Sequence, residues 1–156
     1  MRKGLGIRAR VLIVALLSAS FVGGNVASPP PAEAVVTSLE YQLARYHNNA
    51  RKARGLKPLV IDTTLSDKAR RHTRAMISKG YLFHSSSLPR AYGVGEGAWR
   101  YLGENVGYAS SVLALHNAFM KSYGHRKNIL SRSYKRMGIG IVRSGSRYWV
   151  TVAFIG

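Results

Sequence analysis

The sequence predicts a mixed α/β (α+β) fold in which a small antiparallel sheet lies between layers of helices. Two segments within residues 37–80 carry apolar residues at helical spacing, between residues that typically begin and end helices. Residues 137–155 hold two β-rich runs typical of a hairpin. The second run, Tyr148–Ile155, is apolar at almost every position. A strand that is apolar on both faces needs cover on both sides, so we expect the sheet to be a middle layer.

Residues 1–34 have the layout of a secretory signal peptide. Four basic residues lie within the first ten positions, an apolar run covers 11–22, and Ala32 and Ala34 fit the A-x-A cleavage rule. The apolar run is shorter than the roughly 20 residues of a membrane helix. We expect cleavage after Ala34. The alternative is an uncleaved N-terminal anchor, and either reading places residues 35–156 outside the cytoplasm, as a secreted or envelope-associated protein.

Residues 35–156 are enough for one domain with a single core. The chain contains no cysteine, which excludes both a disulfide framework and a lipidated cysteine anchor. We therefore expect the hydrophobic core alone to stabilise the domain.

This part of the chain is strongly basic, with 20 lysines and arginines against five acids. Such a field attracts polyanions. The basic residues are scattered, without the aromatic pattern or helix-turn-helix signature of nucleic-acid binders, so nucleic acid is a disfavoured partner. For an exported protein, an anionic envelope polymer or a lipid surface is the expected partner. The alternative is a basic surface that serves only solubility.

Two helices are expected first. Thr37 and Glu40 match a capping box, the apolar pattern continues to Ala53, and Gly55 ends the helix. Arg45, Asn48, Arg51 and Lys52 lie off its apolar stripe. After Pro58, a second helix is expected from Thr63 or Thr64 to Gly80, with His72 beside its apolar stripe. We interpret His72 as a packed histidine with a hydrogen-bonded tip.

The segment 81–107 is rich in serine and glycine, and we expect a long irregular loop. Its aromatic residues favour a packed loop over a disordered one. Ser110 or Ser111 then caps a helix that stops near Gly124, with His116 flanking its apolar stripe and interpreted like His72. In the following hairpin, Gly138 and Gly140 share one face of the first strand, where a helix or ligand can approach the backbone closely.

Three residues far apart in sequence, His84, Glu104 and His125, each lie in a short glycine-containing phrase. Brought together, two imidazoles and a carboxylate can hold a divalent cation such as zinc, or anchor a ligand. There is no H-E-x-x-H pair, and the three residues are about twenty positions apart, so spacing alone supports the grouping weakly. The alternative is a metal-free cluster in which Glu104 accepts the imidazole N–H groups and braces the loop.

Taken in order, several phrases resemble the CAP superfamily of cysteine-rich secretory, antigen 5 and pathogenesis-related proteins (SCP domain), in a bacterial, cysteine-free form. These phrases are Asn48-Asn-Ala-Arg51, Gly55-Leu-Lys-Pro-Leu59, Phe83-His84, Gly103-Glu-Asn105, Met120 to Leu130, and Tyr134 to Gly140. The resemblance covers residues 35–156. It implies a three-layer α-β-α sandwich, secretion, and a cleft lined by two histidines and two glutamates.

Carried onto this chain, the resemblance assigns the cleft histidines to His84 and His125 and one glutamate to Glu104. The second glutamate is missing, because Ser122 stands where the resemblance places it. Asn105, Ser122 and Asn128 lie beside these residues in the sequence and are our candidate ligand-binding residues, Asn105 and Asn128 also being expected to satisfy backbone groups. We assign no catalytic residue, since a cleft with one carboxylate puts an inherited acid–base mechanism in doubt.

Two functions follow from these residues. The first is a secreted, non-enzymatic module that binds an envelope, lipid or host ligand and whose His/Glu cleft can hold a divalent cation. The alternative is a divalent-metal-dependent, protease-like hydrolase that uses the same cleft. Members of one fold serve unlike purposes, so the resemblance constrains fold more than activity.

Overall fold

The computed structural model describes residues 36–93 and 100–156. The predicted signal peptide, residues 1–34, lies outside the described residues, and so does Glu96. Within the described ranges, no helix is both long and apolar enough to cross a membrane.

A four-stranded sheet forms the centre of the fold, in the order β1-β3-β4-β2. Strands β3 (Arg136–Ser144) and β4 (Arg147–Ile155) form the predicted antiparallel hairpin, and Gly145 at its turn has a φ of 58°. Strand β2 (Leu102–Ala109) pairs antiparallel with β4, and the short β1 (Val60–Ile61) pairs parallel with β3. The hairpin is confirmed, while β1 adds a parallel pair that we did not expect.

The prediction of an irregular segment over residues 81–107 was wrong in two places: residues 88–92 form a short helix, and the last residues of the segment belong to β2. Gly103, Glu104 and Gly107 weaken the strand signal. Their low strand propensity is overridden by pairing with β4 and by neighbouring side chains. The Tyr134 hydroxyl lies over Gly103 and the Phe119 ring over Gly107, where a side chain would otherwise stand.

In the part of the chain that the structure describes, five helices accompany the sheet: α1 (Ser38–Lys52), α2 (Thr63–Lys79), α3 (Leu88–Tyr92), α4 (Val112–Lys121) and α5 (Tyr123–Leu130). Both halves of the predicted capping box are present between Thr37 and Glu40. Helix α2 ends at Gly80 in the left-handed conformation, as expected, and Ser111 caps α4. We predicted one helix stopping near Gly124. Instead α4 ends at an extended Ser122, and Gly124 lies in the first turn of α5.

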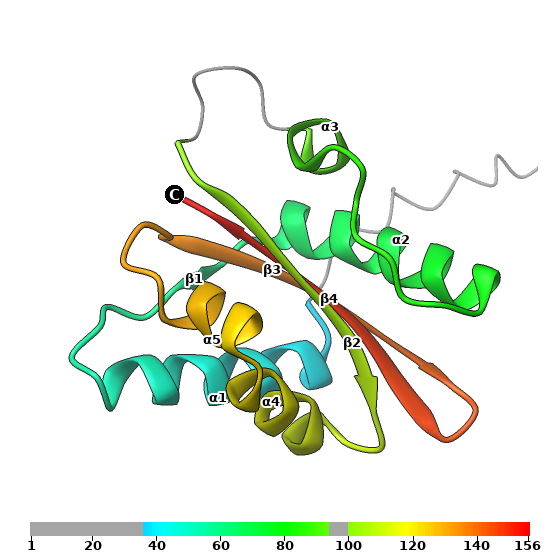
Figure 1. Ribbon diagram of the computed structural model, residues 1–156, viewed down its shortest axis with the longest axis horizontal. Helices are drawn as coiled ribbons and strands as arrows, with labels where there is room; N and C mark the ends of the chain where they lie inside the picture. The colour runs from blue at the N-terminus through cyan, green and yellow to red at the C-terminus, as the bar shows by residue number, and fades with distance from the viewer. Residues whose placement is uncertain (1–35, 94–99) are drawn as a thin grey trace, which may run out of the picture. The chain divides into compact units, whose positions relative to one another are not determined.

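The helices cover both faces of the sheet, which confirms the predicted middle layer. Helices α1, α4 and α5 pack on one face and α2 and α3 on the other, as Figure 1 shows. Alternate residues of β4 point to the two sides: Val150, Val152 and Phe154 join the α1/α4/α5 core, and Ala153 and Ile155 join the α2/α3 core. The fold is therefore a three-layer α-β-α sandwich.

Gly138 and Gly140 explain how closely α2 lies on the sheet. A Cβ at Gly140 would lie 2.1 Å from the backbone nitrogen of Arg70, and one at Gly138 would lie 2.3 Å from the backbone carbon of Leu65. The predicted close approach is that of a helix. The backbone of α2 occupies the space that two side chains would fill.

Charged residues are also buried between the layers. Glu40 is fully buried and accepts hydrogen bonds from Arg70 on α2 and from the backbone N–H of Ile141 on β3. Arg51, which we expected off the apolar stripe of α1, is only 2% exposed. Its guanidinium donates to the backbone oxygens of Lys57, Ile129 and Ser131, and this satisfaction by the backbone allows its burial.

We predict that Gly140→Ala destabilises the protein by about 1–3 kcal/mol, because its methyl group meets helix backbone that can move only with α2. Gly124→Ala is the matched control, since a Cβ there meets nothing within 4 Å. Urea denaturation monitored by circular dichroism measures both. Equal stabilities of the two variants would contradict the close packing of α2 on β3.

Candidate functional site

Glu104 lies on β2 with its side chain only 2% exposed. Its Oε1 accepts from His84 Nδ1 at 2.8 Å and from the Ser85 backbone N–H at 2.9 Å. Its Oε2 accepts from the Ser85 hydroxyl at 2.7 Å and from the Tyr92 hydroxyl. Two carboxylate oxygens with four donors have their hydrogen-bonding capacity filled. Glu104 thus ties the segment after α2, and α3 itself, to the sheet.

These contacts also set the charge of Glu104. Burial alone would raise its pKa, but the hydrogen bonds from Tyr92, Ser85 and His84 outweigh burial and lower the pKa below its ordinary 4.5. The carboxylate is therefore ionised at neutral pH. Conversely, burial and the neighbouring Glu104 charge raise the pKa of Tyr92, so its hydroxyl stays a donor.

His84 is the exposed member of the site, with 59% of its side chain accessible. An ionised carboxylate only accepts hydrogen bonds, so Nδ1 of His84 carries the proton that it donates to Glu104. In the neutral ring, the lone pair is then on Nε2. The ring of His84 is held in one tautomer by a buried acid.

His125 lies in the first turn of α5, against the Phe119 ring at a centroid distance of 4.8 Å. Burial, and secondarily the charge of His84, lowers its pKa below 6.5, so His125 is neutral at pH 7. It lines a hollow of about 250 Å³ together with Ser122. The rest of the lining is mostly apolar: Leu82, Val106, Gly107, Tyr108, Leu115, Ala118 and Phe119.

The structure thus brings His84 and Glu104 into direct contact, and it places His125 close enough for the charge of His84 to lower the pKa of His125. Ser122 shares the hollow of His125, whereas His84 and Glu104 are not among its lining residues. Asn105 and Asn128 have backbone contacts. Asn105 donates to the backbone oxygen of His125, and Asn128 donates to the Asn105 side chain at 2.8 Å and to the backbone oxygen of Glu104. This pair fastens α5 to β2 and so fixes His125 relative to Glu104.

The filled carboxylate bears on the predicted metal role. Glu104 has no free lone pair for a cation, which leaves the ring nitrogens of His84 and His125. Across residues 36–93 and 100–156, no group of three His, Cys, Asp or Glu is placed to hold a metal ion. The site as it stands does not fit a cation bound by all three side chains. Their role as ligands stays a prediction.

Several contacts of this region were not foreseen from the sequence. Ser85 and Tyr92 are the main donors to Glu104, but no sequence spacing links them to it. His72 contacts the Phe83 backbone oxygen through Nε2 at 2.9 Å, as expected for a packed histidine with a hydrogen-bonded tip. His47 on α1 is fully buried, and its Nδ1 lies 2.9 Å from Nδ1 of His116 on α4. Burial, and secondarily His116, lowers the pKa of His47 from 6.5 to about 3.

Comparison with known proteins gives a consistent picture. The profile of the CAP family, described as the cysteine-rich secretory protein family, matches residues 44–154. The chain is 34% identical over 151 residues to YkwD of Bacillus subtilis strain 168, covering 85% of this chain and 57% of that protein. It therefore spans little more than half of that relative. An extracellular protein of Bacillus anthracis with an SCP domain superposes with a TM-score of 0.64 at 27% identity, over 74% of this chain and 39% of that one.

A more distant structure shares the fold alone. NaASP2, crystallised with Zn²⁺, superposes with a TM-score of 0.58 at 13% identity, over 80% of this chain and 82% of that one.

We predict that Glu104→Gln lowers the free energy of unfolding by about 1–3 kcal/mol, because buried donors would face an amide that accepts at only one atom. His84→Ala should cost less than about 1 kcal/mol, since its side chain is mostly exposed. The depressed pKa of Glu104 makes its contribution fully present above the unfolded pKa, near 4.5, and lost as the pH falls through the folded pKa. Urea denaturation between pH 7 and pH 3 should show the two curves, wild type and Glu104→Gln, converging below pH 4.5. A constant gap would contradict an ionised Glu104.

A second pH dependence is expected from His47. Between pH 6.5 and about 3 the unfolded chain binds a proton at this histidine that the folded chain excludes. As the pH is lowered across this window, the free energy of unfolding should therefore decrease by about 1.4 kcal/mol per pH unit because of His47, in addition to the contributions of the other titrating groups. Urea denaturation of His47→Phe over the same range should show a smaller slope of the unfolding free energy against pH, by the amount that corresponds to about one bound proton. An unchanged slope would show that His47 does not stay neutral.

Proposed function

Because the chain belongs to the CAP family of cysteine-rich secretory proteins, we propose that it is an exported, non-enzymatic binding module. Its ligand is an anionic envelope polymer or a lipid surface, with a host molecule as the other class. The signal-peptide layout of residues 1–34 supports export, and so does the extracellular description of the Bacillus anthracis neighbour.

One observation supports a binding role without catalysis: Glu104, the acid of the His84/Glu104/His125 site, already has its oxygens hydrogen-bonded within the protein. All four acceptor positions of Glu104 are taken by donors within the protein, and its pKa is held low. A general acid must hold a proton near its working pH, and a general base needs a free lone pair. Ser122 stands where the family resemblance places a second glutamate, and the other acids of residues 36–93 and 100–156 are bonded elsewhere, so within these residues Glu104 has no acidic partner with which to share the chemistry.

The charge distribution supports an anionic ligand. Each of the four acids in the described residues is already bonded within the chain: Glu40 to Arg70, Asp67 to Arg70 and Arg71, Asp62 to Arg136, and Glu104 to His84. These contacts involve three of the 20 lysines and arginines in residues 35–156. Most of the remaining cations are exposed and can balance the charge of a polyanion, and they are spread over many elements.

Among the described residues, a divalent cation bound at this site would take its ligands from the imidazoles of His84 and His125, with Glu104 orienting the His84 ring. Catalytic zinc sites commonly use three protein ligands. The contact between Glu104 and His84 resembles the support that metal-bound histidines receive, and this is the observation that keeps the hydrolase as the second candidate. Such a cation would polarise a bound oxygen of the ligand.

We predict that the purified protein sediments with vesicles of phosphatidylglycerol, or with anionic cell-wall material, at about 10 mM salt and is released at about 1 M. The Debye length falls from about 30 Å to about 3 Å over this range, which removes a charge-based attraction. Phosphatidylcholine vesicles are the neutral control. Failure to bind either anionic material at low salt would overturn the proposal.

Titration calorimetry with zinc separates the binding module from the hydrolase. The absence of zinc uptake would end the hydrolase candidate. One-to-one uptake that is lost in both His84→Ala and His125→Ala, together with zinc-dependent cleavage of a peptide substrate, would replace the binding module with the hydrolase.

A further inference from the structure

A basic pocket lies where the end of α1 meets the segment after α5. Its volume is about 480 Å³. Its lining consists of Arg51, Gly55, Leu56, Lys57, Pro58, Arg132, Tyr134 and Lys135. None of these residues belongs to the His84/Glu104/His125 site. Four of the eight carry a positive charge and none is an acid.

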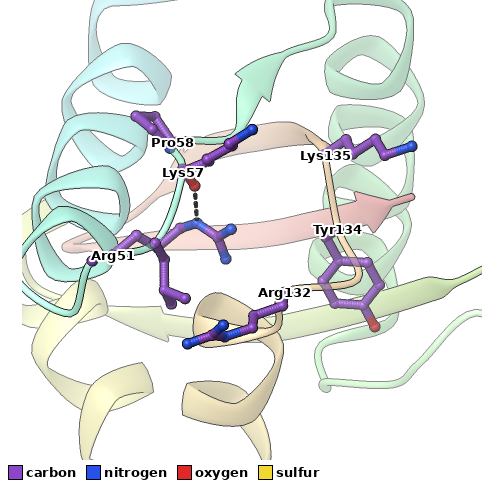
Figure 2. A pocket seen from close by; sticks show the side chains of 8 residues that line it. Arg51, Lys57, Pro58, Arg132, Tyr134 and Lys135 are labelled. Atoms are coloured by element: carbon purple, nitrogen blue, oxygen red, sulfur yellow. Dashed lines mark hydrogen bonds between the residues drawn. The ribbon is translucent and has the colours of Figure 1, made fainter.

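Arg51 is the buried member of this lining. Its Nε donates to the Lys57 backbone oxygen at 2.9 Å, and its Nη1 donates to the backbone oxygens of Ile129 at 2.7 Å and Ser131 at 2.8 Å. Figure 2 shows its guanidinium between the loop of Lys57 and the segment that carries Arg132 and Tyr134. Three carbonyl acceptors fix the position of the guanidinium, but they carry no net negative charge.

No carboxylate balances Arg51 within the described ranges, where Glu40, Asp62, Asp67 and Glu104 are bonded elsewhere. Burial lowers the pKa of Arg51, which means that its charged form lacks the solvation it has in water. An anion bound in the pocket would restore part of that stabilisation.

The exposed cations add to the same field. Lys57 and Arg132 are both exposed and lie on two segments on either side of the Arg51 guanidinium, and the amines of Lys57 and Lys135 point away from it in Figure 2. Long exposed side chains can turn toward a ligand at a modest cost in rotamer entropy. A fixed buried guanidinium with mobile cations at its rim forms a preorganised centre with adaptable contacts.

We propose that this pocket binds a phosphate group. A phosphate group carries one negative charge as a diester and close to two as a monoester, spread over two or three acceptor oxygens that point in different directions, so several cations can contact it at once. The guanidinium of Arg132 offers the forked donors that bind phosphate in pairs, and Lys57 supplies a point charge.

The size of the pocket indicates more than a free ion. Ligand pockets of about 300–1,000 Å³ commonly hold small organic molecules, and this pocket lies within that range. Leu56, Pro58 and the Tyr134 ring supply apolar surface beside the cations. The expected ligand is a phosphate attached to a small organic body, such as a glycerol phosphate unit of a polymer or of a lipid headgroup. Only this choice of source rests on the proposed function; the phosphate site itself does not.

The test is calorimetric titration of the purified protein with sodium phosphate, with glycerol 3-phosphate, and with phosphatidylglycerol vesicles, at about 50 mM salt. The double variant Lys57→Gln/Arg132→Gln changes only exposed residues, so it should fold, and circular dichroism confirms that. We expect glycerol 3-phosphate to bind more tightly than sodium phosphate, and the double variant to weaken its binding at least about tenfold, which is about 1.4 kcal/mol. Stronger dependence on the pocket for vesicles than for glycerol 3-phosphate would identify the source as a lipid surface.

The matched control is Arg74→Gln/Lys79→Gln, which removes the same charge from exposed positions on α2. This control should change binding by less than about twofold, because it alters the field and leaves the pocket intact. If the two double variants weakened glycerol 3-phosphate binding equally, or if neither soluble phosphate bound to the wild type, the proposal that this pocket binds phosphate would be wrong. Vesicle binding that survives in Lys57→Gln/Arg132→Gln would also overturn the pocket as the lipid site while leaving the proposed function in place.

Discussion

The ionised Glu104 carboxylate is the interaction on which the functional side of this fold depends, because it is the point where three separate segments meet. It lies on β2, and its four donors come from the segment after α2 and from α3. Phe83, Leu88 and Tyr92 of those segments pack into the apolar clusters on the α2 side of the sheet, and Glu104 adds a polar anchor to that packing. A buried acid with every acceptor position filled gives them a defined place, since leaving any of the donors unpaired would carry a desolvation cost. Its anchoring role and its weakness as a catalytic group have the same origin.

The sheet supplies the rigid frame for that acid. Strand β4 is covered on both faces, and the missing side chains of Gly138 and Gly140 let the backbone of α2 lie directly on β3. Such close contact leaves little freedom for β2, which pairs with β4 along its length. Hydrogen bonds from Asn105 to the His125 backbone oxygen, and from Asn128 to Asn105, then hold α5 and His125 against β2. His125 is thus positioned by polar contacts as much as by packing.

The sequence could predict what depends on local patterns, and it missed what depends on long-range contacts. The capping box at Thr37, the glycine that ends α2 and the C-terminal hairpin are all coded by neighbouring residues. Strand β2 was missed because Gly103 and Gly107 are favourable there only once Tyr134 and Phe119 fill the space beside them. Arg51 was expected off the apolar stripe of α1, and its burial was not foreseen because the carbonyl groups that accept its hydrogen bonds come from positions up to 80 residues away. The residues of the His/Glu site came from the family resemblance and from glycine-containing phrases, while Ser85 and Tyr92 carry no sequence signal that links them to Glu104.

The cost of burying a charge, and the partners that offset it, account for the contrast between the buried acid Glu104 and the buried base Arg51. Glu104 is a buried anion whose charge is met by four hydrogen-bond donors, and its pKa falls accordingly. Arg51 is a buried cation whose partners are neutral carbonyls, and burial lowers its pKa as well. For the acid, a lower pKa means a more stable charge; for the base, it means a less stable one. The first centre is electrostatically complete and has little to gain from a ligand, whereas the second gains from any anion that can enter the pocket. This contrast is the physical basis for proposing an anion site at the end of α1 and no acid–base chemistry at β2.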